Sequence, residues 1–371
     1  MKQFSIMLKP ASSACNFRCK YCFYADLAGK RDTFCFGSMS RDTARKILKN
    51  LSRDLVQGDR IEFAFQGGEP TLVGLPWYQE FVSMVKELLP GRQISYALQT
   101  NGTKLNDAWG EFLKENQVLV GLSIDGSAQY HNACRVDMDG EGTYGQLMEA
   151  VKLLRKHRVE FNILCTLTAD IARHPAQIWK WILKNDFQYV QFTPCLDDLG
   201  DPGKSPYAIH PQRFAYFYTH LFPLWLEDFR AGKYRSIKFF DDVVNLLAYG
   251  VPTACGIHGK CTCQMVVESD GGAYPCDFYC LDEYKLGNLT EDSILSMVSG
   301  ETARAFLGRP RETMPLCEGC PYLRFCGRGC RRMQREVYCG PEDDTCGYRE
   351  FLDLSMPALQ QIAMEQRNYR R

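Results

Sequence analysis

The sequence predicts an α/β protein in which an incomplete barrel of six βα units is followed by a cysteine-rich segment. From residue 3 to about residue 195, short β-rich runs alternate with longer amphipathic stretches, the pattern of repeated βα units with a parallel sheet. The 18 cysteines are also unevenly distributed along the chain, with three from Cys15 to Cys22 and eleven from Cys255 to Cys346. Two separate metal-bearing regions are therefore expected.

The expected elements follow one another in regular order. Strands are predicted over residues 4–8, 61–65, 94–99, 118–124, 161–167 and 189–192. A helix is predicted from Ser40, with Thr43, to Leu55, and further helices over 76–89, 107–116, 143–158 and 174–185. Six strands are too few for a closed eight-stranded barrel. Chemistry in βα folds gathers at the carboxyl ends of strands, so the loops there are where function is expected.

The rest of the chain follows a different pattern. Residues 196–210 are predicted to form a loop, followed by a helix from about 211 to 231. After residue 250 only a short hairpin, 264–268 with 271–275, and a final helix over 348–367 are expected. These patterns predict a barrel with linker (1–235), a cysteine-rich domain (236–347) whose fold depends on metal, and a terminal helix (348–371).

Composition narrows the classes of partner. Lys plus Arg and Asp plus Glu both number 44, so the net charge is zero, and neither nucleic acid nor an anionic membrane is expected. The N-terminus lacks the apolar run of a signal peptide, and no run approaches the roughly 20 apolar residues of a membrane span. A cytoplasmic location is expected. Because the cytosol keeps thiols reduced, the cysteines indicate metal binding rather than disulfides.

The first cysteine group lies directly after the first strand, with Cys15, Cys19 and Cys22 in a C-x3-C-x2-C spacing and Tyr21 before the last. Three thiolates on one tight loop can hold three irons of a [4Fe–4S] cube and leave the fourth open to a ligand. The motif resembles that of the radical S-adenosylmethionine (SAM) superfamily, which implies that SAM chelates the open iron and is cleaved to a 5′-deoxyadenosyl radical. A zinc site, or three unrelated buried thiols, is the alternative.

Loops after later strands agree with this resemblance. The run Gln66, Gly67, Gly68, Glu69 and Pro70 matches the superfamily's GGEP element, which implies that its backbone accepts hydrogen bonds from the amino group of SAM. An ordinary turn is the alternative. Candidates for binding the ribose and the carboxylate of SAM follow the next two strands: Gln99, Ser123, Asp125 and Arg135. Arg135 is a candidate for a bidentate contact with the carboxylate of SAM. A surface salt bridge is an equally weighted alternative for this residue.

The second cysteine group matches the SPASM domain, the auxiliary-cluster module of peptide-modifying radical SAM enzymes. Eight thiolates fully ligate two [4Fe–4S] cubes, which suits electron transfer rather than substrate binding. The resemblance assigns four cysteines to a nearer and four to a farther cluster: Cys255, Cys261, Cys276 and Cys330, then Cys317, Cys320, Cys326 and Cys346. Paired zinc knuckles are the alternative. Cys263 and Cys280 each lie close in the sequence to a proposed ligand, so either of them could replace an assigned cluster ligand.

The resemblance then narrows to the anaerobic sulfatase-maturating enzymes. It rests on stretches spread over nearly the whole chain: Lys9–Ser13, Cys22–Tyr24, Phe63–Gln66, Leu98–Thr103, Phe161–Cys165 and Tyr274–Tyr279. Members of this family oxidise a cysteine or serine of a sulfatase to Cα-formylglycine. The implied cofactors are SAM and three [4Fe–4S] clusters. The implied partners are an unfolded or nascent sulfatase polypeptide and an electron donor such as flavodoxin or ferredoxin.

The implied reaction needs a base and an electron sink. The deoxyadenosyl radical removes a hydrogen from the substrate Cβ, and the resulting carbon radical must lose an electron and a proton. Asp277, next to Cys276, matches the family's proposed base, and the nearer auxiliary cluster is the implied electron acceptor. The alternative for Asp277 is a carboxylate that only fixes the loop near a cluster. Tyr24 is expected to line the peptide channel, with a core aromatic as the alternative.

Two other functions compete with this interpretation. Another SPASM enzyme, which forms thioethers in a ribosomal peptide or epimerises it, would share these cysteines. Such enzymes often carry an additional N-terminal recognition domain, whereas the first strand here starts by residue 4. A non-catalytic iron–sulfur carrier would share them too, although the GGEP element argues against it. The sequence does not determine whether the target is cysteine, serine or both.

Overall fold

The computed structural model describes residues 2–312, 314–340 and 343–369, and the chain forms two compact units. The first unit contains Met1–Ser123, Arg135–Phe161 and Thr262–Arg309. The second contains Ile124–Cys134, Asn162–Cys261 and Pro310–Arg371. The cysteine-rich part of the chain is therefore shared between the units. The functional boundaries expected near residues 235 and 347 stay predictions.

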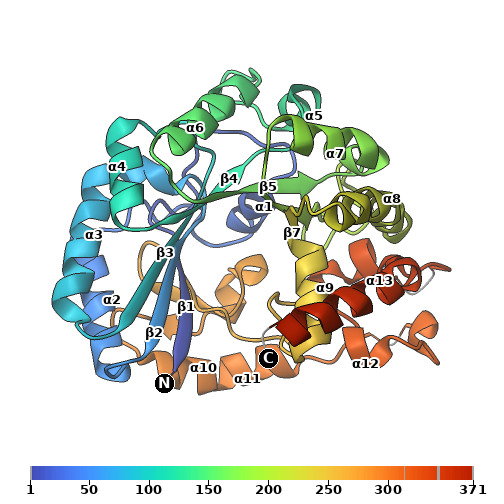
Figure 1. Ribbon diagram of the computed structural model, residues 1–371. Helices are drawn as coiled ribbons and strands as arrows, with labels where there is room; N and C mark the ends of the chain where they lie inside the picture. The colour runs from blue at the N-terminus through green and yellow to red at the C-terminus, as the bar shows by residue number, and fades with distance from the viewer. Residues whose placement is uncertain (1, 313, 341–342, 370–371) are drawn as a thin grey trace. The chain divides into compact units, whose positions relative to one another are not determined.

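The first unit is built on strands in the order β10-β9-β8-β1-β2-β3-β4 (Figure 1). Its parallel centre consists of β1 (Gln3–Leu8), β2 (Arg60–Phe65), β3 (Gln93–Thr100) and β4 (Leu119–Ser123). The strand β8 (Val266–Val267) pairs parallel to β1, and β9 (Gly272–Tyr274) and β10 (Gly287–Asn288) continue antiparallel. The predicted strands and hairpin of this unit are confirmed to within two residues at most ends.

Helices alternate with these strands as the apolar spacing predicted. They are α2 (Arg41–Asp54), α3 (Leu75–Leu88), α4 (Asp107–Glu115) and α6 (Tyr144–Lys156). Ser40 caps α2 by accepting a hydrogen bond from Thr43 N at 2.9 Å, which satisfies a free N–H of the first turn. The helix α1 (Phe23–Gly29) was not predicted, because seven residues are too few for a helical period to show. The short helices α10 (Ile294–Ser299) and α11 (Glu301–Gly308) were missed for the same reason.

The second unit contains β5 (Phe161–Leu167), β6 (Tyr189–Pro194) and β7 (Ser236–Ile237), which pair in parallel. Its predicted helices are confirmed as α7 (Pro175–Lys184), α8 (Pro211–Arg230) and α13 (Gly347–Tyr369). Helices that were not predicted complete it: α5 (Ala128–Cys134), α9 (Lys238–Tyr249) and α12 (Leu323–Cys326).

Aromatic side chains fill the core of each unit. In the first, Phe65 of β2 meets Tyr78 and Phe81 of α3 edge-on, with ring centroids 5.0 and 5.3 Å apart. In the second, Phe240 of α9 stacks on Phe351 of α13 with centroids 5.7 Å apart. The contacts in the first unit join β2 to the helix that follows it, whereas the contact in the second joins elements far apart in the sequence.

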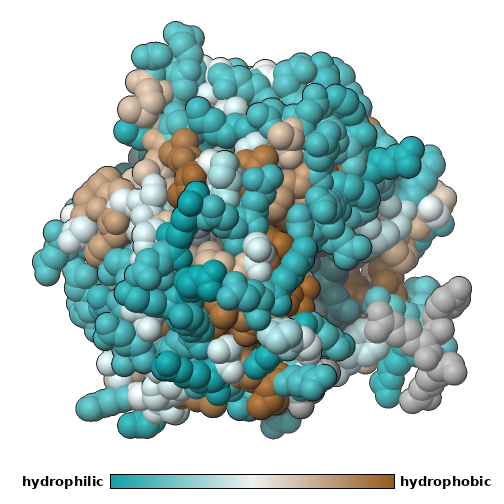
Figure 2. All heavy atoms as spheres, turned by 90° about the vertical axis from the view of Figure 1, so that its left-hand side faces the viewer, coloured by the Kyte–Doolittle hydropathy of each residue, from teal (hydrophilic) through white to brown (hydrophobic). Residues whose placement is uncertain are grey.

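The outer helices explain the character of the surface. In α2, residues at helical spacing such as Ala44, Ile47 and Leu51 are buried, while Arg41 and Lys46 are exposed. Figure 2 shows that the face on the α2 and α3 side is largely hydrophilic, with hydrophobic side chains in separate patches. Among the described residues, no helix has the length and apolar character needed to cross a membrane.

Candidate active site

The cysteine triad lies on the loop between β1 and α1, and its thiols differ in exposure. Cys22 is exposed, whereas Cys15 and Cys19 are partly buried. Cys22 is also the N-cap residue of α1, and its N–H donates to Cys19 O over 3.2 Å. The loop is thus fixed by β1 before it and by a helix start after it, and it keeps at least one thiol open to the outside.

Side-chain hydrogen bonds tie this loop to the end of β3. Asn16 accepts from Asn101 Nδ2 and donates to Thr103 Oγ1, both over 2.9 Å. Asn101 in turn accepts from Thr103 N at 3.1 Å. The residue after the first cysteine of the triad is therefore held by the polar turn that follows β3.

Arg135 lies beside the triad. Arg18 N donates to Val136 O over 2.8 Å, which holds the segment after Arg135 against the triad loop. Arg135 Nη1 lies 4.0 Å from Cys19 Sγ, and the guanidinium lies 5.5 Å from the ring centroid of Tyr21. A positive charge therefore lies next to the triad. The assignment of Arg135 to SAM stays a prediction.

The GGEP element packs against the loop that precedes the triad. Gly68 N donates to Ser12 O and Glu69 N to Ala14 O, both over 2.8 Å. A Cβ on Gly68 would lie 2.1 Å from Ala14 O, and one on Gly67, whose φ is +120°, would lie 2.8 Å from Ser12 O. The glycines therefore permit a close approach between two backbone segments of the site.

The Glu69 carboxylate is buried and joins the GGEP element to β3. It accepts from Thr71 N at 3.0 Å, from Thr100 Oγ1 at 2.7 Å and from Asn101 N at 2.7 Å. Burial raises the pKa of Glu69 in spite of these hydrogen bonds. Its side chain is thus engaged within the protein, and the predicted contact of this residue with SAM concerns its backbone.

The remaining predicted SAM residues lie on several elements. Gln99 lies in β3 next to Thr100, and Ser123 is the buried last residue of β4. Asp125 belongs to the second unit, where its carboxylate accepts from Thr166 N at 2.8 Å and its N–H donates to His131 Nδ1 at 3.2 Å. Their roles toward SAM stay predictions.

Asp277 belongs to a buried network of charges in the first unit. Its Oδ1 lies 2.7 Å from Lys9 Nζ, and its Oδ2 accepts from Gln66 Nε2 at 3.0 Å. The Lys9 side chain is 0% exposed and that of Asp277 is 11% exposed. Gln66, predicted to bind SAM, therefore orients the predicted base in this structure.

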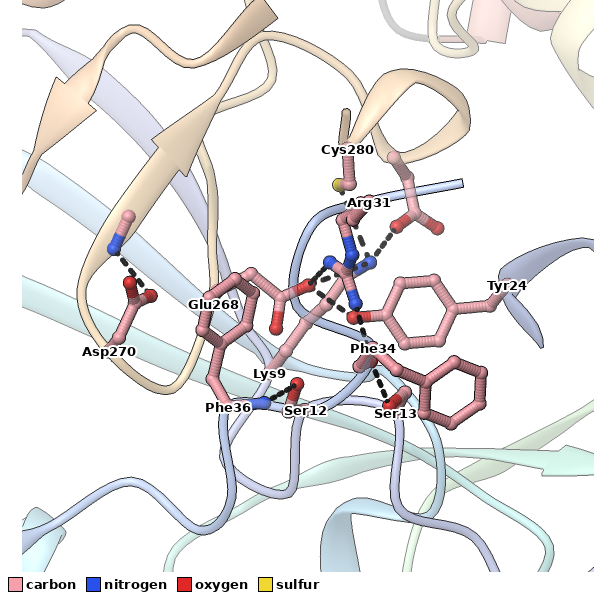
Figure 3. A network of polar contacts seen from close by, with 12 residues as sticks. Lys9, Ser12, Ser13, Tyr24, Arg31, Phe34, Phe36, Glu268, Asp270 and Cys280 are labelled. Atoms are coloured by element: carbon pink, nitrogen blue, oxygen red, sulfur yellow. Dashed lines mark hydrogen bonds and ion pairs between the residues drawn. The ribbon is translucent and has the colours of Figure 1, made fainter. Parts of the chain in front are cut away.

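The network continues from Lys9 to Glu268, as Figure 3 shows. Glu268 Oε1 lies 4.0 Å from Lys9 Nζ and 2.7 Å from Arg31 Nη1. It also accepts a hydrogen bond from the hydroxyl of Tyr24. Lys9 Nζ lies over the Tyr24 ring, 3.5 Å from the ring centroid. Two buried cations thus face two carboxylates, which leaves the group close to neutral when all four are ionised.

The pKa shifts follow from this pairing. Burial alone would lower the pKa of Lys9, but its anionic neighbours, Asp277 first among them, raise it well above its ordinary value. Burial would likewise raise the pKa of Glu268, but Lys9 and Arg31 bring it below its ordinary value. For Tyr24, burial raises the pKa, and the phenol stays protonated as a donor. Because Tyr24 is buried in this network, its predicted contact with a peptide stays untested.

Cysteines of the second unit gather around one cavity. Five of them line it: Cys317, Cys320, Cys326, Cys339 and Cys346. Its walls are otherwise largely aromatic and aliphatic, with Tyr322, Leu323, Tyr338, Tyr348 and Leu352. Four of the five thiols are the predicted ligands of the farther cluster. A thiol-lined, apolar cavity fits an iron–sulfur cluster.

The described parts of the chain contain no set of three or more His, Cys, Asp or Glu side chains arranged around the position of a single metal ion. A cubane cluster requires its ligand sulfurs to lie farther apart, because four irons and four sulfides separate them. The spread of thiols around a cavity is therefore compatible with a cluster.

The other predicted auxiliary ligands are divided between the units, with Cys276 in the first. In the second, Arg331 Nη2 lies 3.8 Å from Cys261 Sγ, and a Cβ on Gly256 would lie 2.7 Å from Cys330 Cβ. Cys255 and Cys261 thus belong to a segment that contacts Cys330. The assignment of these ligands stays a prediction.

Cys263 and Cys280 were the two cysteines that could replace an assigned cluster ligand. Cys280 is fully buried, and its Sγ accepts from Lys9 Nζ at 3.5 Å and donates to Cys276 O at 3.6 Å. The Cys280 thiol therefore belongs to the charge network. Cys263 is partly buried in the first unit.

Comparison with known proteins agrees with this distribution of sites. The Radical SAM superfamily matches residues 10–170, and the SPASM iron–sulfur cluster-binding domain matches residues 259–321. The cysteine-type anaerobic sulfatase-maturating enzyme of Clostridium novyi is 38% identical over 98% of this chain and 98% of its own length. The chain belongs to the anaerobic sulfatase-maturating enzymes.

The chain is more similar to the cysteine-type than to the serine-type members of this family. The serine-type anaerobic sulfatase-maturating enzyme of Bacteroides thetaiotaomicron is 28% identical over 89% of this chain and 83% of its own length. A solved structure of the family member anSMEcpe, with bound AdoMet and Cp18Cys peptide, has a TM-score of 0.89 and 36% identity and covers 98% of this chain and 99% of that one. The predicted fold, a partial radical SAM barrel with a SPASM domain, is confirmed. So are the enzyme class and the cofactors, SAM and iron–sulfur clusters.

Several residues of the site were not predicted from the sequence. Lys9 contacts the predicted base, Glu268 and Arg31 extend the network beyond Lys9, and Asn16 fixes the triad loop. One readable signal was Lys9 itself, a cation at the end of a strand whose alternate residues Ile6 and Leu8 are fully buried. The partner of Lys9 lies in a distant segment, and no local pattern in the sequence indicates that pairing.

Proposed function

We propose that this enzyme oxidises a cysteine of a sulfatase polypeptide to Cα-formylglycine. The observation that carries the proposal is the Asp277 carboxylate, held by Lys9 at 2.7 Å and by Gln66 at 3.0 Å beside the predicted cluster ligand Cys276. Greater identity to the cysteine-type than to the serine-type relatives, 38% against 28%, supports cysteine as the target. The peptide bound in the solved structure of anSMEcpe supports a polypeptide substrate.

When bound, SAM and its cluster supply the radical that removes a hydrogen atom from the substrate Cβ, and the auxiliary clusters supply an electron acceptor. The substrate then carries a carbon radical that loses one electron and one proton to become a thioaldehyde, which water hydrolyses to the aldehyde with release of hydrogen sulfide. Asp277 receives the proton at its carboxylate. Lys9 lies at Oδ1 and Gln66 at Oδ2, so the carboxylate is oriented before the substrate arrives.

The triad loop and the strand ends form the proposed SAM site. Cys15, Cys19 and Cys22 ligate the catalytic cluster, and Arg135, next to Cys19, binds the carboxylate of SAM. The backbone of Gln66–Glu69 binds its amino group. Residues that contact the rest of SAM or the peptide are Gln99, Ser123, Asp125 and Tyr24.

The cellular partners follow from this chemistry. Cleavage of SAM consumes one electron, so a low-potential donor such as flavodoxin or ferredoxin supplies it. The polypeptide reaches the site before the sulfatase folds, because the target residue must enter the site in an extended segment. A cytoplasmic location fits a chain with many thiols that must stay reduced.

The test is anaerobic incubation of the reconstituted enzyme, SAM and reductant with a sulfatase-motif peptide in cysteine and serine forms. Mass spectrometry measures the conversion of the peptide, and chromatography measures the 5′-deoxyadenosine formed. Conversion of the cysteine form to formylglycine, at a higher rate than the serine form, is expected. Preference for serine would overturn the choice of target. Formation of 5′-deoxyadenosine with both peptides unmodified would overturn the sulfatase substrate and leave the radical chemistry intact.

A further inference from the structure

Glu268 is a buried carboxylate in the turn between β8 and β9 of the first unit. Its side chain is 0% exposed. Its N–H donates to Gly272 O and its C=O accepts from Gly271 N, both over 2.9 Å, so the backbone is fixed on both sides. A charge buried in this way is costly unless cations pair with it, and its partners therefore indicate what it does.

Three groups converge on one oxygen of this carboxylate (Figure 3). Oε1 lies 2.7 Å from Arg31 Nη1 and 4.0 Å from Lys9 Nζ, and it accepts a hydrogen bond from the hydroxyl of Tyr24. The other oxygen, Oε2, is buried and accepts no hydrogen bond from the residues that the structure describes. A buried carboxylate oxygen without a donor lowers stability, so stability alone does not explain Glu268.

Lys9 joins Glu268 to the proposed base. Its N–H donates to Val267 O at 2.9 Å, in continuation of the parallel pairing of β1 with β8, so its backbone is fixed next to the turn that carries Glu268. Its ammonium reaches Asp277 Oδ1 at 2.7 Å and lies 3.5 Å from the centroid of the Tyr24 ring. The four-carbon stem of a lysine is flexible, so the ammonium has one defined place only where several groups hold it.

We propose that Glu268 is a positioning residue that holds the Lys9 ammonium and, through it, the orientation of Asp277. The inference rests on the proposed function, in which Asp277 is the base. Lys9 and Arg31 are two buried positive charges, and Glu268 supplies one of the two carboxylates that they face. Without the charge of Glu268, Asp277 would be the remaining carboxylate of this network, and its oxygens would turn toward the cations rather than the substrate.

The competing role is that Glu268 only neutralises Arg31 and fixes the loop after α1. Arg31 Nη2 also donates to Phe34 O at 3.1 Å, so the pair does tie that loop to the β8–β9 turn. The two roles differ in what a neutral side chain at this position changes. Loss of the loop contact would impair radical formation and peptide oxidation alike, whereas loss of the positioning role impairs only the step that Asp277 performs.

The experiment compares Glu268→Gln and Glu268→Asp with the wild-type enzyme, and adds Glu268→Gln to Asp277→Asn. Glutamine keeps the shape and removes the charge, and aspartate keeps the charge on a shorter stem. The matched control is Asp59→Asn, a buried carboxylate of the same unit that accepts from Lys2 N at 2.7 Å and from Val56 N at 3.0 Å. Each full-length protein is reconstituted anaerobically, and its iron, 5′-deoxyadenosine and formylglycine are measured with the cysteine-form peptide.

The expected result in Glu268→Gln is a kcat for formylglycine formation about 10- to 100-fold lower, with an unchanged KM for the peptide. More 5′-deoxyadenosine should form per oxidised peptide. Glu268→Asp should recover part of the rate, and Asp59→Asn should keep the wild-type ratio of the two products. In the Asp277→Asn background, Glu268→Gln should cause no further loss, because the group that it positions is absent.

Two outcomes overturn this inference alone. One is a wild-type ratio of formylglycine to 5′-deoxyadenosine in Glu268→Gln, and the other is an equal further loss in the Asp277→Asn background. If Glu268→Gln does not bind its clusters, Glu268→Asp takes its place in the same comparison, and the same two outcomes decide. A wild-type enzyme that leaves the peptide unmodified would instead overturn the proposed function, and this inference with it.

Discussion

The two cysteine-bearing regions of this enzyme are built in different ways. The triad lies on a loop of the first unit, held by strand ends and a helix start, and Cys22 is exposed. The cavity cysteines of the second unit lie on short turns and on α12, and Cys326 and Cys339 are buried. Regular α/β structure thus holds the triad loop, whereas short turns hold most of the cavity cysteines, and we expect the enclosed site to depend more on bound metal for its order.

The largest expected effect comes from removing one ligand in each region. In Cys19→Ala, SAM cleavage should be abolished and iron should fall by about a third, since one of three clusters is lost. Cys320→Ala should lose a similar share of iron but still form 5′-deoxyadenosine, because the open cluster remains. Iron analysis and chromatography measure both results. If Cys320→Ala also fails to cleave SAM, the two regions are not separable in this way.

The next effect separates radical formation from substrate oxidation within the first unit. Asp277→Asn keeps the shape of the side chain but removes the base, so formylglycine formation should fall by about 10²- to 10⁴-fold while 5′-deoxyadenosine still forms. The matched control is Asp282→Asn, an exposed carboxylate of the same segment that accepts from Asp32 N at 2.8 Å. Equal losses in the two variants would show that Asp277 only fixes its loop.

The sequence predicted the regular elements of the barrel better than the contacts between distant segments, for physical reasons. The strands from Gln3–Leu8 to Tyr189–Pro194 and most long helices were found because buried faces impose regular periods on the residues. The triad, the GGEP element and Arg135 were proposed from short motifs or from their place after a strand, and the structure brings them together in the first unit, while their roles stay predictions. A local pattern in the sequence was enough for each of them.

What the sequence could not predict depends on contacts between distant segments. Lys9 directly follows the first strand and Glu268 lies in the β8–β9 turn, and no local pattern in the sequence indicates that the two lie close together. The place of Cys339 in the same cavity as Cys317 and Cys346 likewise appears only when the chain is folded. The helix α9 is different, because Phe240, Val243 and Val244 are buried at helical spacing, and that signal was readable.

A smaller effect tests the charge network, which the thiol-lined cavity lacks. Lys9→Met leaves the buried Asp277 without its cation, so the free energy of unfolding should fall by about 3–5 kcal/mol. The double variant Lys9→Met with Asp277→Asn should recover part of that loss, because it removes both partners. Anaerobic urea unfolding measures both.

The matched control for Lys9 is an exposed ion pair of the same unit. Arg45 Nη1 lies 2.9 Å from Glu87 Oε1, and both side chains are largely exposed. Water screens that pair, so Arg45→Met should cause no measurable loss of stability. Equal effects of Lys9→Met and Arg45→Met would contradict the view that the network is a buried, mutually dependent group.

The smallest effect tests whether the open cluster site depends on backbone contact, as the comparison of the two regions implies. In Gly68→Ala the new Cβ meets Ala14 O at 2.1 Å, so the GGEP element and the triad loop must move apart, at a cost of about 1–3 kcal/mol. Gly145→Ala is the control, because a Cβ there meets nothing within 4 Å and alanine stabilises a helix by about 0.5–1 kcal/mol. The iron content of the cluster at the triad should fall in Gly68→Ala. The iron content of the auxiliary clusters should stay unchanged in both variants. If Gly68→Ala loads its triad like wild type, the loop does not need that close contact, and the ordering of the open site must come from the metal, as in the enclosed one.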